Sequence, residues 1–181
     1  MRSEMLISSA SAAVAFGAAA MAAWAARGTS VKDSFDLARS LYAELTSPTA
    51  AAARSALEFY RRAPARTDTE TRDVLDHYFA LLWAFEHVHA GRESLTGQKR
   101  INGTGPAVDY LDKMTAWHVS EWARRWSGLR HLIHEHTPDL DDHHSISSFC
   151  DLADAVLGPA DTIRTLRQEI DEEARRRTAA P

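Results

Sequence analysis

The sequence contains few residues of the kinds that mark disulfide-rich or nucleic-acid-binding proteins. Its single cysteine, Cys150, cannot form an internal disulfide, which argues mildly against a small secreted domain. Acidic residues outnumber basic ones by 25 to 21, which gives a formal net charge of -4. Nucleic-acid-binding domains usually carry a basic patch or a pI above about 9, so we expect no nucleic acid among the partners of this chain.

The sequence also lacks the short motifs of several large enzyme classes. It contains no Gly-x-Ser-x-Gly nucleophile elbow, no Walker A loop and no Gly-x-Gly-x-x-Gly dinucleotide fingerprint. Cys150 lies near a predicted helix start, where a thiol can become reactive, but a small buried side chain is the favoured interpretation. We therefore expect no bound cofactor and favour a protein without catalytic activity.

By contrast, one stretch of 22 residues, from Met5 to Ala26, has no charged side chain. A helix of that length is about 33 Å long, which is enough to cross a hydrocarbon core of about 30 Å. We interpret residues 1–27 as an N-terminal membrane anchor. Two alternatives stay open. Residues 23–25 resemble the cleavage site of a secretory signal, and half of the stretch is alanine, which also suits a soluble or interfacial helix.

The charges that flank this stretch predict its orientation. Arg27, Lys32 and Arg39 follow it, whereas Arg2 precedes it. The positive-inside rule then places the C-terminal domain of a single-pass cell-membrane protein in the cytoplasm.

Small residues within the same stretch point to a contact between two anchors. Ser9, Ala13 and Gly17 stand four residues apart, so they share one helix face. Small residues at this spacing let two transmembrane helices approach closely. The pattern predicts a homodimer, although an alanine-rich helix also produces it by chance.

The remaining sequence predicts helices, because no useful segment alternates apolar and polar residues with period 2. Thr67 and Glu70 form a capping box, which opens a helix that we expect to end at Gly91. Its apolar residues cover most sides, so it should be the central helix of a bundle. A glycine-rich loop over residues 91–106 and a long helix over residues 107–136 are expected to follow.

The predicted fold is therefore all-α, with an N-terminal transmembrane helix followed by a bundle of about five to six helices. We divide the chain into an anchor or signal (1–27), a helical bundle (28–158) and a C-terminal amphipathic helix and tail (159–181). The apolar stripe of this last helix contains Ile163, Leu166 and Ile170, and we expect it on the bundle surface.

The tryptophans of the long predicted helix allow two interpretations. Trp122 and Trp126 stand one helical turn apart, and tryptophan is common both in cores and at protein interfaces. The core is the favoured place for both rings. The alternative is a partner-binding groove in which Trp122, Trp126 and Arg125 contact an acidic protein.

Histidine spacing raises a metal hypothesis. Glu86 and His89 form the Glu-x-x-His element that di-iron bundles use twice, but a second copy is missing. His131, His134 and Glu135 share one face of a later helix without the His-Glu-x-x-His order of metalloproteases. These five residues are the metal-ligand candidates, and solvated or capping roles are the favoured interpretation.

Two stretches carry a resemblance to a known family. Val74–Gly91 has an apolar helix closed by a glycine, and Tyr110–Ile133 has a tryptophan-bearing helix followed by the short helix Ser145–Asp154. Together they resemble a family of uncharacterised bacterial single-pass membrane proteins with an N-terminal anchor and a small helical domain. The likeness covers roughly residues 5–157 and departs in the glycine-rich loop and the last helix. The family has no established activity, so the resemblance implies no catalytic residue.

These observations favour a membrane-anchored, cytoplasmic-facing helical module that binds or regulates another protein. The first alternative is a helical metal-binding protein or enzyme that uses Glu86, His89, His131 and His134. The second is a secreted helical domain released by cleavage of the N-terminal stretch.

Overall fold

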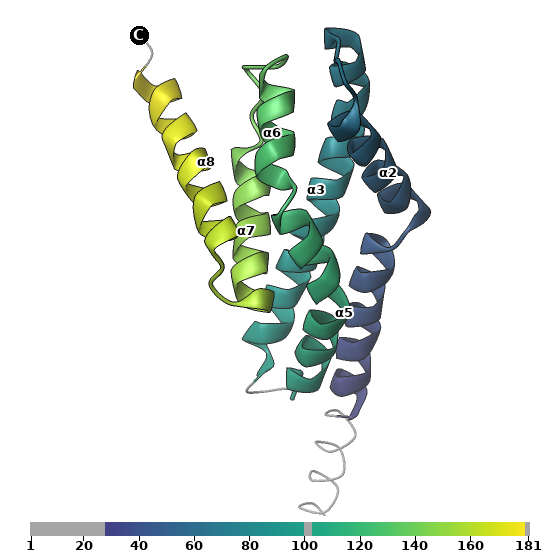
Figure 1. Cartoon of the computed structure of the whole chain (residues 1–181). Coiled ribbons are helices and arrows are strands. Elements are labelled where there is room, and N and C mark those ends of the chain that lie inside the picture. Colours follow the sequence, from purple (N-terminus) through teal and green to yellow (C-terminus); the bar gives the residue numbers. More distant parts are fainter. Residues whose placement is uncertain (1–27, 100–102, 180–181) are drawn as a thin grey trace, which may run out of the picture.

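The computed structural model describes residues 28–99 and 103–179, and within these ranges the regular elements are helices without a strand. The predicted all-α class is confirmed. After a helix over residues 28–45 come α2 (Pro48–Arg62), α3 (Asp68–Gly97), α5 (Gly105–Ala123), α6 (Trp126–His134), α7 (His143–Leu157) and α8 (Asp161–Ala179) (Figure 1).

The predicted membrane anchor, residues 1–27, lies outside the described residues, and so do Ser9, Ala13 and Gly17 of the predicted homodimer contact. Among the helices of residues 28–99 and 103–179, none combines the length and the apolar character that a membrane crossing requires.

Helix α3 lies at the centre of the bundle, where it contacts α2, α5 and α7 (Figure 1). Its predicted capping box is confirmed: the Glu70 amide donates to the Thr67 hydroxyl at 3.2 Å, and the Thr67 amide donates to the Glu70 carboxylate at 2.9 Å. These bonds satisfy two of the amide groups that a helix start leaves unpaired.

The predicted end of this helix at Gly91 is wrong, because α3 continues to Gly97. Gly91 marks a helix crossing. A Cβ atom there would lie 2.3 Å from Cδ1 and 3.1 Å from Cγ of Leu41, on helix 28–45. An added Cβ would therefore force the Leu41 side chain to shift, so the residue acts through packing between helices and not through the end of one.

We expect Gly91→Ala to destabilise the fold by about 1–3 kcal/mol through overpacking against Leu41. The gain of about 1 kcal/mol in helix propensity offsets only part of this cost. Gly128→Ala is the matched control, because a Cβ atom at this position inside α6 would meet nothing within 4 Å. This variant should stabilise the fold slightly through its higher helix propensity. Urea unfolding of both variants tests this, and equal midpoint shifts would contradict it.

The long helix expected over residues 107–136 is broken between α5 and α6. The Arg125 amide donates to the Trp122 carbonyl, three residues back, at 2.9 Å. This tighter turn ends α5 at Ala123, and α6 begins at Trp126. The break separates the helix that carries Trp122 from the helix that carries Trp126.

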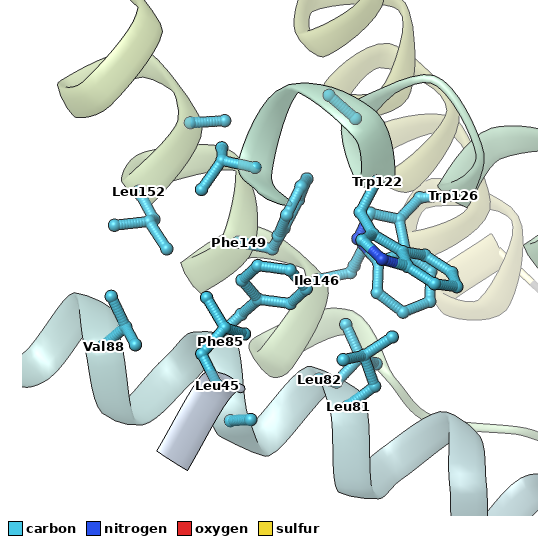
Figure 2. Close-up of a cluster of buried hydrophobic side chains, with 14 of the residues drawn as sticks. Leu45, Leu81, Leu82, Phe85, Val88, Trp122, Trp126, Ile146, Phe149 and Leu152 are labelled. Carbon is cyan, nitrogen blue, oxygen red and sulfur yellow. The ribbon is translucent and has the colours of Figure 1, made fainter. Parts of the chain in front are cut away.

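The core is dominated by large apolar and aromatic side chains from most of the helices (Figure 2). Trp126 is fully buried, and its ring lies 4.9 Å from the Trp122 ring and 5.8 Å from the Phe149 ring between centroids. The last helix shares this core, because Ile163, Leu166 and Ile170 are at most 2% exposed. Helix α8 thus packs against the bundle through this apolar stripe.

Candidate functional site

A buried polar cluster joins α3, α6, the start of α7, and α8. Its members are Tyr78, Arg130, His134, Asp142 and Glu173. Arg130 is 5% exposed and the Asp142 side chain 1%. Charged side chains are seldom buried this fully unless they are paired.

Arg130 is the centre of the cluster. Its Nε donates to Asp142 Oδ2 at 2.8 Å and its Nη2 donates to Asp142 Oδ1 at 2.7 Å, which is a bidentate ion pair. The same Nη2 donates to Glu173 Oε2 at 2.8 Å, and the Tyr78 hydroxyl donates to Asp142 Oδ2. One guanidinium therefore links α6 to α8 and to the residue that precedes α7.

The side chain of Asp142 makes unusual contacts for a residue at a helix start. It is the N-cap residue of α7, where an aspartate side chain normally accepts an amide hydrogen bond from the first turn. Here the carboxylate makes no such bond and turns to Arg130 and Tyr78. The N-cap side chain of α7 thus serves the buried ion pair, while the His143 amide donates to Asp141 Oδ1 at 3.4 Å.

Burial alone would raise the pKa of Asp142, but hydrogen bonds and the charge of Arg130 outweigh it and hold this pKa well below its usual range. Burial works against the charged form of Arg130 too, yet the Asp142 carboxylate raises the pKa of its guanidinium. Burial and the same carboxylate raise the pKa of Tyr78. The ion pair therefore stays charged and Tyr78 keeps its proton.

His134 lies at the edge of this cluster, between two carboxylates. Its Nδ1 is 3.3 Å from Glu173 Oε1, and its Nε2 is 3.7 Å from Asp142 Oδ1, too far for a hydrogen bond. A pocket of about 740 Å³ opens beside it, between α6 and α8. The pocket is lined by Ser127, Gly128, Arg130, His131, His134, Pro138, Glu169, Glu173 and Arg176.

Within residues 28–99 and 103–179, His134, Asp142 and Glu173 form the one group of three whose donor atoms lie within 4.8 Å of one another, as a metal site needs. Arg130 already donates to both carboxylates of this group. A metal ion would have to share them with a guanidinium, so the arrangement fits an ion-pair cluster better than a metal centre.

The metal-ligand candidates from the sequence are not brought together. Glu86 accepts a hydrogen bond from the Ser145 hydroxyl at 2.8 Å, and His89 lies one turn further along α3. The His131 side chain is 77% exposed, and its Nε2 lies 3.4 Å from Glu135 Oε1. Of the five candidates, only His134 belongs to the group that the structure assembles.

The other members of the cluster carry no signal in the sequence. Arg130 and Asp142 stand on either side of the turn between α6 and α7, but an arginine and an aspartate at that spacing usually stay in solvent. Glu173 is 43 residues from Arg130, and no local pattern relates them. Only the packing of α8 brings them together.

The structure places Trp122 and Trp126 in the core, which is the favoured interpretation of the sequence, and not in the alternative partner-binding groove. Trp122 is 2% exposed and Trp126 is fully buried, because both rings pack into the core on either side of the break between α5 and α6. Arg125 lies over the Trp122 ring, 5.4 Å from its centroid, and forms an ion pair with Glu121. The arginine covers a core ring and is held by an acid of its own chain.

Among the residues that the structure describes, three other aromatic side chains are exposed. Phe59 on α2 is 80% exposed, Trp117 on α5 is 67% exposed and Trp83 on α3 is 54% exposed. Helix α3 is the central helix, as predicted, but its side at Trp83 is exposed. Large apolar side chains in solvent mark a contact surface when they gather with suitable neighbours.

The buried ion pair predicts how stability depends on pH. The pKa of Asp142 lies lower in the folded chain than the value of about 3.9 expected when unfolded. Asp142 therefore stabilises the fold above that value, and this stabilisation is lost as the pH falls below about 4. We expect the urea midpoint to fall more steeply between about pH 6 and pH 3 in the native chain than in Asp142→Asn. Asp36→Asn, at an exposed acid, is the control; parallel slopes for the native chain and Asp142→Asn would contradict the prediction.

No protein-family model, no curated protein and no solved structure matches this chain. Its function is therefore inferred from the residues themselves.

Proposed function

We propose that this chain is a membrane-anchored helical domain that binds another protein on the cytoplasmic side of the cell membrane. The proposed anchor is the uncharged stretch from Met5 to Ala26, with the positive residues that follow it. The resemblance of roughly residues 5–157 to a family of uncharacterised bacterial single-pass membrane proteins also favours a membrane anchor.

The observation that carries the binding function is the exposure of large aromatic rings on a well-packed bundle. Phe59, Trp83 and Trp117 stay in solvent, although the core buries other aromatic residues completely. Tryptophan is enriched among the residues that dominate binding energy at protein interfaces. These rings offer apolar area that a partner protein can bury.

Fractionation of the full-length protein with a C-terminal tag tests its membrane localisation and orientation. We expect the tag in membranes washed with carbonate and expect it to resist protease added from outside the cell. A shortened protein in the medium or periplasm would contradict the anchor and favour the secreted alternative.

A second candidate is a metal-binding protein, because His134, Asp142 and Glu173 lie close enough to share an ion. The melting temperature, measured with and without added metal, distinguishes the two candidates. A specific metal at saturating concentration should raise the melting temperature, and His134→Ala should abolish the rise while His131→Ala keeps it. No rise with Zn²⁺, Mn²⁺ or Fe²⁺ would eliminate this candidate.

A further inference from the structure

We propose that the partner binds the exposed face of α3 around Trp83, and that it presents arginine side chains to this face. This inference rests on the proposed protein-binding function. The Trp83 face consists of Asp76, Phe79, Trp83, Glu86 and His87, which share one side of α3 at helical spacing. Two further residues border it, Glu44 on helix 28–45 and His144 on α7.

The indole of Trp83 is exposed but held in place. It packs on Phe79, with ring centroids 5.7 Å apart, and Phe79 packs on Tyr78 at 5.5 Å. Tyr78 in turn contacts the buried ring of Trp126 at 5.5 Å. This series of rings runs from the core to the surface. An anchor that is already ordered loses little conformational entropy when a partner covers it.

Three carboxylates lie on or beside the Trp83 face. Asp76 and Glu86 lie on the same face of α3, and Glu44 lies beside it, with its Oε1 2.7 Å from Nδ1 of His87. Glu86 Oε1 is 3.2 Å from Nε2 of His144. A guanidinium placed over an indole ring gains a cation–π contact and can donate to carboxylates at the rim. Arginine is therefore the side chain that this face recognises best.

The other exposed aromatics stand among different charges. The surface hollow beside Phe59 is lined by Arg54, Arg62 and Arg125 as well as by acids. Trp117 has Lys113 one turn before it on α5, and the acid one turn after it, Glu121, is paired with Arg124 and Arg125. Basic neighbours repel an arginine, so the Trp83 face is the one of the three that selects a basic partner.

A lipid surface is a poorer occupant of the Trp83 face. Helix 28–45 rises about 24 Å between residue 28 and Glu44, and Glu44 contacts α3 one turn from Trp83. A helix that leaves the bilayer at residue 28 holds this ring away from the headgroups. The carboxylates around the ring would also repel anionic lipids.

Site-specific photo-crosslinking in the full-length, membrane-bound protein tests the proposal. The photoreactive residue benzoylphenylalanine replaces Ala90, which is exposed two turns beyond Trp83 on the same side of α3. Matched positions are Ser55, one turn before Phe59, and Lys113, one turn before Trp117, both exposed. We expect a protein adduct at position 90 whose crosslinked peptide contains arginine, and whose yield falls at about 0.5 M salt, because salt screens the ion pairs.

Two substitutions separate recognition from proximity. Trp83→Ala should lower the affinity for the crosslinked segment, made as a synthetic peptide, by about 30-fold or more, which is typical of an interface hot spot. Trp117→Ala should leave that affinity unchanged. Because Trp83 is largely exposed, its removal should leave the fold intact, and circular dichroism of the variant checks this.

The remaining outcomes overturn the proposal in distinguishable ways. A protein adduct at position 55 or 113 and none at position 90 refutes the Trp83 face but leaves the protein-binding function standing. A lipid adduct at position 90, or a protein segment without basic residues, refutes the arginine assignment. The absence of a protein adduct at all three positions refutes both the inference and the proposed function.

Discussion

Arg130→Met is expected to lower the free energy of unfolding by about 3–5 kcal/mol, because it leaves the Asp142 carboxylate buried without its cation. The Asp142 side chain is 1% exposed, so water cannot replace the two hydrogen bonds that Arg130 donates to it. Glu173 loses its bond to the same guanidinium, which weakens the attachment of α8. At about 2–4 °C per kcal/mol, the melting temperature should fall by about 6–20 °C.

The control for this prediction is Arg124→Met, at an arginine whose side chain is 63% exposed and forms an ion pair with Glu121. We expect a change of less than about 1 kcal/mol there, as for other exposed ion pairs. The double variant Arg130→Met, Asp142→Asn should lose less than the sum of the two single variants, because each single variant leaves one buried charge without its partner and the double variant removes both charges. If Arg130→Met had the same melting temperature as the native chain, the cluster would contribute nothing to stability.

Trp126→Ala is expected to cost about 3–5 kcal/mol, the usual range for truncating a large buried aromatic residue. Its ring is fully buried and contacts Tyr78, Phe85 and Phe149 edge to face, in addition to Trp122. Removing it leaves a cavity where α3, α6 and α7 meet, which the surrounding rings cannot fill without moving. Urea unfolding followed by far-UV circular dichroism measures the loss.

The indole Nε1 of Trp126 is buried without a hydrogen-bond partner. Trp126→Phe removes this N–H and keeps part of the ring contacts, so its loss should be clearly smaller than that of Trp126→Ala. Trp117→Ala is the surface control, because 67% of Trp117 is exposed and little burial is lost. Equal losses for the Trp117 and Trp126 variants would mean that the core does not depend on the buried ring.

Local patterns predicted the helices well where their chemistry is local. The capping box of Thr67 and Glu70 satisfies amides within one turn, and the apolar stripe of the last helix follows from residues three or four apart. Gly91 shows the limit of this reasoning. A glycine that ends a helix and a glycine that admits a neighbouring helix look the same in sequence, and only the position of Leu41 distinguishes them.

The candidate site was predicted less well, for a related reason. A buried charge is stable only with its partner, and the partner of Arg130 on α8 comes from a helix far along the chain. His134 was found because histidine spacing drew attention to it, whereas Asp142 and Glu173 are ordinary acids in sequence. Trp83 and Trp126 present the same difficulty, because composition does not tell an exposed indole from a buried one.

The pair of indoles where α5 meets α6 gives the protein an optical property. Trp122 and Trp126 have centroids 4.9 Å apart and ring planes inclined at 43°, a close and asymmetric arrangement that should produce a strong near-ultraviolet circular dichroism band. The band should vanish when core packing loosens, even while the far-ultraviolet helix spectrum persists, which is how a molten globule differs from a native state. A spectrometer can thus follow this one junction of the bundle during acid or thermal denaturation, without any added label.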